Sequence, residues 1–207
     1  MDDRHGDEGP AGFLTIGDLT DEQRHAREVA DAVWDIDLEV VDADAVARGT
    51  GDRYDRLWWH RTEPIDGDLS DALAAALDTH VADGGDLLVS LYAMTAVADV
   101  GVDPRPPDRI EDAYRPTHAW EHRPSGFLVK SRLADRPPFD GFDDLRVHTQ
   151  PCERESVPRI AYDRRVPEHG VVLASTVVGE EDYPNHNSVI AWEHGDGRVL
   201  GIGRDIN

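Results

Sequence analysis

The sequence predicts an α/β domain with a mainly parallel sheet, helices on both faces of that sheet and a β-rich C-terminal hairpin. Two observations support this fold class. Short apolar strands alternate with helix-like segments through residues 12–91, and this order favours parallel strands joined by right-handed crossovers. The last third has runs of β-branched residues around a turn at 195–197, which indicates a hairpin.

The first strand and the first helix have clear local signals. Residues 12–16 alternate in the manner of a strand, and Thr20 and Gln23 have the spacing of a capping box. Apolar residues then recur at helical spacing, and they are Ala26, Val29, Ala30 and Val33. We therefore expect a helix from Asp21 to Trp34.

The next segments repeat the alternation of strand and helix. A second strand is expected at residues 36–41 and a loop at 42–51. A strand at 54–60, a helix at 69–82 and a strand at 86–91 follow. Parallel strands in this order bring their carboxyl ends to one edge, where open α/β sheets place ligands.

The second half is less regular. Five prolines fall between residues 103 and 124, so this stretch cannot be a long helix or a central strand and should be a surface excursion. Short strands are expected at 126–130, 170–178, 188–192 and 198–202. The last two should pair as the hairpin.

The amino-acid composition limits the kinds of molecule that this chain can bind. The chain of 207 residues has a net charge of -22, from 30 Asp and 13 Glu against 20 Arg and the single lysine Lys130. Nucleic acid and anionic membranes are poor partners, because binding them requires a basic surface. The even, Asp-rich acidity is typical of salt-in halophiles, where concentrated salt screens the repulsion between carboxylates.

Length and local composition suggest one domain. Residues 1–10 are polar and should form a disordered leader, and residues 11–207 should form a single domain. No apolar run is long enough to span a bilayer, and the first residues lack the features of a signal peptide. Cys152 is the only cysteine, so no intramolecular disulfide can form and a cytoplasmic location is expected.

Several motifs together resemble the class I glutamine-amidotransferase-like superfamily, in particular its trehalose-utilisation (ThuA-like) branch. The segments that carry the resemblance are 54–60, 84–91, 139–142 and 191–199. The resemblance implies a flavodoxin-like sheet. More narrowly, three segments are similar to an accessory region that accompanies glycoside hydrolase family 32 enzymes of halophilic archaea. They are Leu-Trp-Trp-His-Arg at 57–61, Gly-Phe-Leu-Val-Lys at 126–130 and Arg-Val-His-Thr at 146–149.

The chain departs from the amidotransferase pattern at the residues that matter for catalysis. That chemistry needs a thiolate on a strained strand-to-helix turn, activated by a histidine. Leu91, Tyr92 and Ala93 occupy the turn instead, and Cys152 lies in an acidic loop. We therefore expect glutaminase chemistry to be absent and no residue to have a catalytic role.

A ligand site is nevertheless expected at the carboxyl edge of the sheet. Its candidate residues follow the predicted strands, and they are Trp59, His60, Arg61, Tyr92, Arg204 and Asp205. The aromatic side chains, with Trp120, would stack on a sugar ring, and the polar ones would bind its hydroxyls. In the alternative, Trp58 packs in the core while His60 and Arg61 pair with local acids such as Glu63.

No metal or cofactor is expected. His118, Glu121 and His122 spell an inverted zinc-protease motif, but Pro116 and Pro124 leave too little room for the helix that this motif requires. The glycines near the C-terminus do not precede a helix, so they form no nucleotide-binding loop.

Three functions remain open. The first is a non-catalytic domain that binds a sugar-like ligand or associates with a glycoside hydrolase. The second is a sugar-modifying hydrolase or isomerase that uses His60 and Asp205 as acid and base. The third is a homo-oligomeric module assembled through the edge of the C-terminal hairpin.

Overall fold

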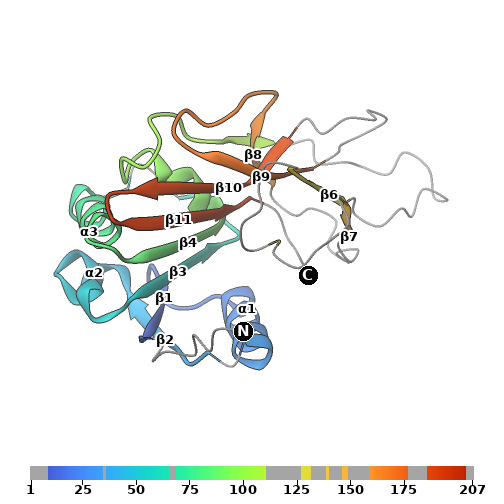
Figure 1. The fold of residues 1–207 in the computed structure, drawn as a ribbon. Coiled ribbons are helices and arrows are strands. Elements are labelled where there is room, and N and C mark those ends of the chain that lie inside the picture. Colours follow the sequence, from blue (N-terminus) through green and yellow to red (C-terminus); the bar gives the residue numbers. More distant parts are fainter. Residues whose placement is uncertain are drawn as a thin grey trace, which may run out of the picture.

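A mixed β-sheet forms the centre of the molecule (Figure 1). The structure, a computed structural model, describes residues 9–34, 36–65, 69–110, 127–131, 139, 146–148, 159–176 and 186–203. Within these residues the sheet has 11 strands, and its main path runs in the order β2-β1-β3-β4-β11-β10-β9-β6-β7. The predicted α/β fold class is confirmed.

Neighbouring strands in the first half of this path are parallel. The strands are β2 (Leu38–Asp42), β1 (Ala11–Thr15), β3 (Arg56–Arg61), β4 (Asp86–Leu91) and β11 (Gly197–Ile202). The chain passes from β1 to the edge strand β2 and then returns across β1 to β3. The direction of winding therefore reverses at β1, which is where doubly wound sheets bind ligands.

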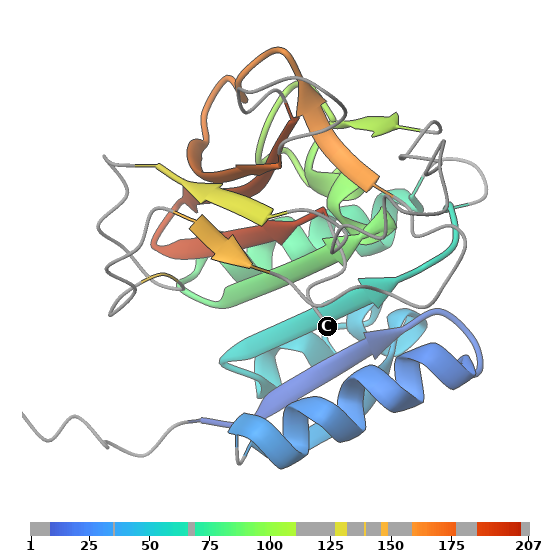
Figure 2. The same cartoon turned by 90° about the vertical axis from the view of Figure 1, so that its right-hand side faces the viewer.

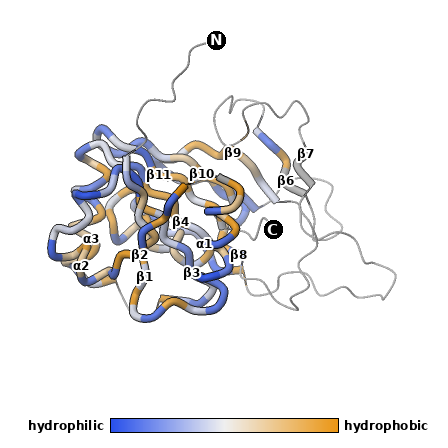
Figure 3. The backbone as a smooth tube through the Cα atoms, turned by 90° about the horizontal axis from the view of Figure 1, so that it is seen from below, coloured by the Kyte–Doolittle hydropathy of each residue, from blue (hydrophilic) through white to orange (hydrophobic). Residues whose placement is uncertain are grey.

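Helices cover both faces of the parallel strands, as predicted (Figure 2). One face packs against α1 (Asp21–Trp34), and the other against α2 (Ala43–Ala47) and α3 (Asp71–Ala82). The two faces have separate cores: Phe13 belongs to the cluster with α1, and its neighbour Leu14 belongs to the cluster with α3. Consecutive residues of a strand, such as Phe13 and Leu14, are therefore both apolar and buried. Figure 3 shows hydrophobic stretches interspersed with hydrophilic ones along the backbone.

The N-terminus of α1 has the predicted capping box. Gln23 N donates to Thr20 Oγ1 at 3.2 Å, and Thr20 N donates to Gln23 Oε1 at 3.0 Å. The apolar periodicity located the helix, but Val29 and Val33 are 44% and 69% exposed whereas Ala30 is 3% exposed. The buried side passes through Gln23 and Ala30, which turns the two valines toward solvent.

The loop expected at residues 42–51 is partly helical. Asp42 caps α2, because its side chain accepts a hydrogen bond from Asp44 N at 2.9 Å. Ala43 and Val46 are buried against the sheet, so tertiary packing stabilises a helix that is too short to form alone. A 3₁₀ helix, η1 (Thr50–Arg53), follows α2.

The other half of the sheet is antiparallel. β10 (His186–His194) pairs with β11 as the predicted hairpin, and the sheet continues through β9 (Val171–Thr176), β6 (Phe127–Lys130) and β7 (Arg146–His148). Because β11 also pairs with β4, both hairpin strands lie inside the sheet. The hypothesis of assembly through a hairpin edge is therefore wrong.

A two-stranded ribbon lies beside the main path of the sheet. Its strands are β5 (Asp108–Ile110), which lies within the proline-rich segment, and β8 (Arg159–Asp163), which also pairs with β10. Gly203 fits tightly here, since an added Cβ would lie 1.7 Å from the carbonyl oxygen of Ile160. Only glycine permits this approach.

Two expectations concern residues that the structure does not describe. Residues 1–8 of the expected leader lie outside the described part, as do residues 111–124 of the proline-rich excursion. Among the helices that are described, none combines the length and the apolar character that crossing a membrane requires.

Candidate functional site

The turn after β4 has the backbone of a strained elbow. Leu91 has φ 55° and ψ -126°, and the 3₁₀ helix η2 (Tyr92–Val97) begins directly after it. A leucine rarely adopts this conformation, which costs about 1–3 kcal/mol and is typical of functional turns. Some α/β enzymes carry their catalytic nucleophile on a strained turn between a strand and a helix. Here the side chain is aliphatic and 3% exposed, so the position has no nucleophile.

Tyr92 lies against a cation and not on an open surface. Its side chain is 6% exposed, and the Arg109 guanidinium carbon lies 5.2 Å from the centre of its ring. Arg109 belongs to β5, so the ribbon covers the turn after β4. The ring that we expected to stack on a ligand is therefore already covered.

The two adjacent tryptophans of β3 point to opposite faces. Trp59 is fully buried in the core with α3, so the stacking role that we expected for it is not available in this structure. Trp58 is partly buried on the α1 face, where its ring meets Phe13 edge-on with centroids 5.1 Å apart. The alternative that placed Trp58 in the core is thus correct in part: Trp58 packs against the cluster on the α1 face, but it is only partly buried.

His60 forms a polar cluster with the next strand. His60 Nδ1 lies 2.8 Å from Ser90 Oγ, and Trp58 Nε1 donates to the same oxygen at 2.9 Å. Which atom donates between His60 and Ser90 depends on the tautomer of the imidazole. Ser90 is 7% exposed. The cluster satisfies a buried hydroxyl, and it also places a base beside that hydroxyl.

The end of β3 is attached to its surroundings by local contacts. Arg61 donates to the carbonyl oxygens of Glu63 and Pro64, at 3.3 and 3.1 Å. Gln23 Nε2 donates to the carbonyl oxygen of His60 at 2.8 Å, which fastens the first turn of α1 to this strand. Arg61 therefore contacts the local loop through backbone oxygens, and the ion pair with an acid such as Glu63 that the alternative predicted is not formed among the described residues.

Several candidates lie outside the described residues. Arg204 and Asp205 belong to this group, so the structure does not bring them to His60 or separate them from it. The zinc-like motif at 118–122, with Trp120, and Cys152 belong to it as well. Among the residues that are described, no group of His, Cys, Asp or Glu has the arrangement of a metal site.

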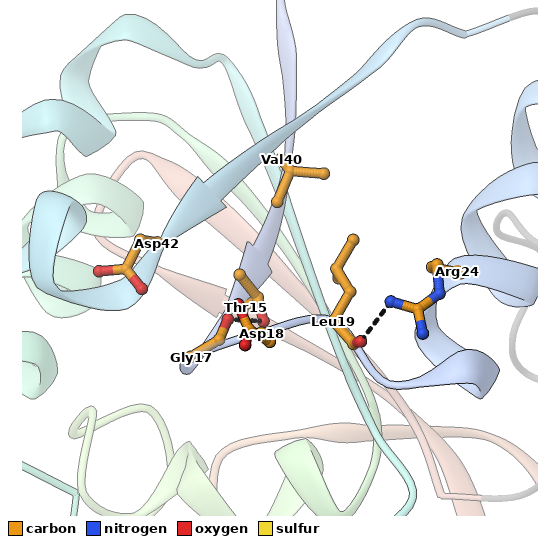
Figure 4. A pocket seen from close by; sticks show the side chains of 7 residues that line it. All are labelled: Thr15, Gly17, Asp18, Leu19, Arg24, Val40 and Asp42. Carbon is orange, nitrogen blue, oxygen red and sulfur yellow. Dashed lines mark hydrogen bonds between the residues drawn. The ribbon is translucent and has the colours of Figure 1, made fainter.

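The sequence analysis missed a hollow of about 670 Å³ at the carboxyl ends of β1 and β2 (Figure 4). The residues that line it come from β1, β2, the loop after β1 and the first turn of α1. They are Thr15, Gly17, Asp18, Leu19, Arg24, Val40 and Asp42. The available signal was the pair of acids, Asp18 and Asp42, that follow two predicted parallel strands.

The polar side chains that line the hollow differ in whether they already form hydrogen bonds or ion pairs. Thr15 Oγ1 donates to the carbonyl oxygen of Gly17 at 3.0 Å. Arg24 donates to the carbonyl oxygen of Leu19 at 2.7 Å and forms an ion pair with Asp21 at 2.5 Å. Asp18, in contrast, is exposed and has no hydrogen bond or ion pair with any described residue.

No family model and no curated protein sequence matches this chain. Solved structures do match. A β-galactosidase from Bacillus circulans sp. alkalophilus has a TM-score of 0.60 at 13% identity, and the match covers 95% of this chain and 28% of that chain. This chain thus spans little more than a quarter of that enzyme.

Two smaller proteins match over most of their length. A proposed GMP synthase component from Thermoplasma acidophilum has a TM-score of 0.55 at 10% identity, covering 94% of this chain and 84% of that chain. A proposed ThuA-like protein from Bacteroides uniformis has a TM-score of 0.53 at 10% identity, and the match covers 98% of this chain and 86% of that chain.

Identities this low establish the fold alone. None of the three proteins is a family 32 glycoside hydrolase, so the narrower resemblance receives no support from them. The broader resemblance is confirmed at the level of fold: the chain has a class I amidotransferase-like fold, with a mixed, mainly parallel sheet and flanking helices.

Proposed function

We propose that this chain is a non-catalytic amidotransferase-like domain that serves a carbohydrate-active system, by binding a sugar-like ligand or by associating with a glycoside hydrolase. One observation carries the non-catalytic part. Leu91 retains the strained backbone of a nucleophile turn, but its side chain is aliphatic and buried.

The surroundings of Leu91 support this proposal. Covalent catalysis at such a turn requires a nucleophile that substrate can reach and a nearby base. Leu91 offers no reactive atom, and the next residue, Tyr92, is covered by Arg109. His60 is hydrogen-bonded to Ser90 on the adjacent strand β4, and Ser90 also accepts a hydrogen bond from Trp58 of β3. The turn therefore has the shape of a reaction site without its chemistry.

The carbohydrate part has support from the fold comparison. A domain-sized portion of a β-galactosidase has a fold similar to that of nearly the whole chain. Such a portion can serve a glycosidase without taking part in its chemistry, because fold and activity are separable. We extend this arrangement to the present chain.

Turnover assays test the proposal. The purified chain is incubated with L-glutamine and with nitrophenyl galactosides, mannosides and glucosides in molar potassium chloride. We expect no product above the rate without protein. Release of ammonia or nitrophenol that scales with protein concentration and persists through purification would contradict the non-catalytic assignment.

A second candidate function has one observation in its favour. His60 Nδ1 lies within hydrogen-bond distance of Ser90 Oγ at the carboxyl ends of β3 and β4, as in a base that activates a hydroxyl. This supports a hydrolase that uses His60, with Asp205 as its proposed partner. If turnover is found, replacing His60 by alanine should abolish it while leaving the fold intact. His25→Ala, at an exposed position of α1, is the matched control.

A further inference from the structure

We propose that the hollow at the carboxyl ends of β1 and β2 binds a small neutral polyol of the sugar class, whose hydroxyls donate to Asp18 and Asp42. This inference rests on the proposed function and gives its ligand a location. The hollow is separate from the strained turn at Leu91, and all the residues that line it are described.

Topology places the hollow where this type of sheet binds ligands. Doubly wound sheets bind ligands beyond the carboxyl ends of their strands, next to the strand at which the winding reverses. That strand is β1, and Thr15 at its end lines the hollow. On the other side of β1, Gln23 of α1 donates to the carbonyl oxygen of His60 near the end of β3. The hollow lies on the β2 side, because Val40 and Asp42 line it.

The lining combines apolar and acceptor groups. Val40 is 38% exposed, and with Leu19 it provides an aliphatic surface for the C–H face of a ring. Figure 4 shows Asp18 close to Thr15 and Gly17, and Asp42 apart from them at the end of β2. The Asp18 side chain forms no hydrogen bond or ion pair with any described residue, and Asp42 uses one carboxylate oxygen to cap α2. Carboxylate oxygens that remain open can accept hydrogen bonds from hydroxyl groups.

Charge argues against an anionic ligand. The only cation that lines the hollow is Arg24, which is already paired with Asp21 and bonded to the carbonyl oxygen of Leu19. Asp18 and Asp42 would repel a phosphate or a carboxylate, as would the net charge of -22. A neutral polyol can donate to both acids without bringing a charge of its own.

Calorimetric titration tests this inference. Galactose, glucose and lactose are titrated up to about 50 mM into the intact chain, a range that reveals millimolar dissociation constants. We expect at least one of these sugars to bind, and glucose 6-phosphate to bind at least tenfold more weakly than glucose. If none of the three sugars binds, or if the phosphate binds as well as glucose, the inference fails.

Substitutions in the hollow test whether the sugar binds there. Asp18→Ala should weaken binding at least tenfold, and Val40→Phe should abolish it by filling the apolar part. Asp37→Ala is the matched control, because Asp37 is also exposed and acidic but precedes β2, at the opposite end of that strand. Binding that survives both hollow variants overturns this location. Spermidine binding that depends on Asp18, without sugar binding, would identify a cation site instead.

The two proposals fail in different ways. Absence of sugar binding, with turnover also absent, removes the ligand assignment and leaves a non-catalytic domain that associates with a hydrolase. Turnover removes the non-catalytic assignment, whatever the result of the sugar titration.

Discussion

Asp103 accepts a hydrogen bond from Trp192 Nε1 at 3.1 Å, and both residues are buried, at 0% and 1% exposure. The same carboxylate accepts hydrogen bonds from the backbone N–H groups of Arg105, Glu168 and His169, at 3.0–3.1 Å. It thereby joins the segment before β5, the segment after β8 and the second half of β10. Arg109, which covers Tyr92, belongs to β5, the strand that follows the first of these segments.

Replacing Asp103 by asparagine should lower the free energy of unfolding by about 2–4 kcal/mol. The asparagine NH₂ group would face N–H donors and leave at least one of them without an acceptor. Urea denaturation measures the effect. Asp99→Asn, at an exposed position, is the control and should change stability by less than about 0.5 kcal/mol. Equal effects of the two substitutions would show that the buried carboxylate is not structural.

Ser90→Ala should lower the free energy of unfolding by about 1–3 kcal/mol, because it leaves the Trp58 N–H without its acceptor. A double-mutant cycle isolates this contribution. In a Trp58→Phe background the donor is already absent, so Ser90→Ala should cost less there. An identical cost in both backgrounds would mean that the hydrogen bond between Trp58 and Ser90 contributes nothing to stability.

His80 makes stability depend on pH. It is 7% exposed, and burial lowers its pKa from the usual 6.5, although a hydrogen bond with the backbone of Asp86 and nearby carboxylates act in the opposite direction. Between the folded pKa and 6.5 the unfolded chain binds more protons. Stability from this group is therefore complete above about pH 6.5 and decreases as the pH falls toward the folded pKa.

Unfolding free energies measured from pH 7.5 to 5 test this dependence. His80→Gln should make the curve less steep, by at most about 1.4 kcal/mol per pH unit. His25→Gln, at an exposed position, should leave the slope unchanged. A steeper curve for His80→Gln would mean that the folded protein favours protonated His80, which is the opposite of the expected sign.

Local signals predicted most of the fold. The capping box of Thr20 and Gln23 lies within one helical turn, so α1 was located to the residue. The segment Ala43–Ala47 has no such signal beyond Asp42, and its burial depends on a sheet that the sequence does not show. Helix α2 was missed for that reason.

The candidate site was predicted less well, because it depends on which face a residue occupies. Alternation places Trp58 and Trp59 on opposite faces, but helices cover both faces of this sheet, so the pattern does not reveal which indole is more buried. The hollow combines two strands and a turn that are separate in sequence, with Asp18 and Asp42 on different segments. Only the assembled sheet brings them together.

Stability should rise with salt if the acidity reflects adaptation to concentrated salt. Raising potassium chloride from 0.1 to 2 M should raise the melting temperature by about 5 °C, equivalent to roughly 2 kcal/mol for a domain of this size. Removing three exposed acids, with Asp37, Asp83 and Asp99 replaced by asparagine, should reduce this increase. An unchanged increase would attribute the effect to general salt exclusion and not to charge screening.

Leu91 provides a direct test of the strained turn. Its φ of 55° is easy for glycine and unfavourable for alanine, so Leu91→Gly should be at least as stable as Leu91→Ala. Both should be less stable than the parent chain by about 2–5 kcal/mol, because a buried leucine is lost. Leu77, fully buried in α3, is the matched control. There the alanine variant should be more stable than the glycine variant by about 1 kcal/mol in the free energy of unfolding. If Leu91→Ala is also more stable than Leu91→Gly by that margin, the turn is not strained. The similarity to a nucleophile turn, on which the proposed function depends, would then be lost.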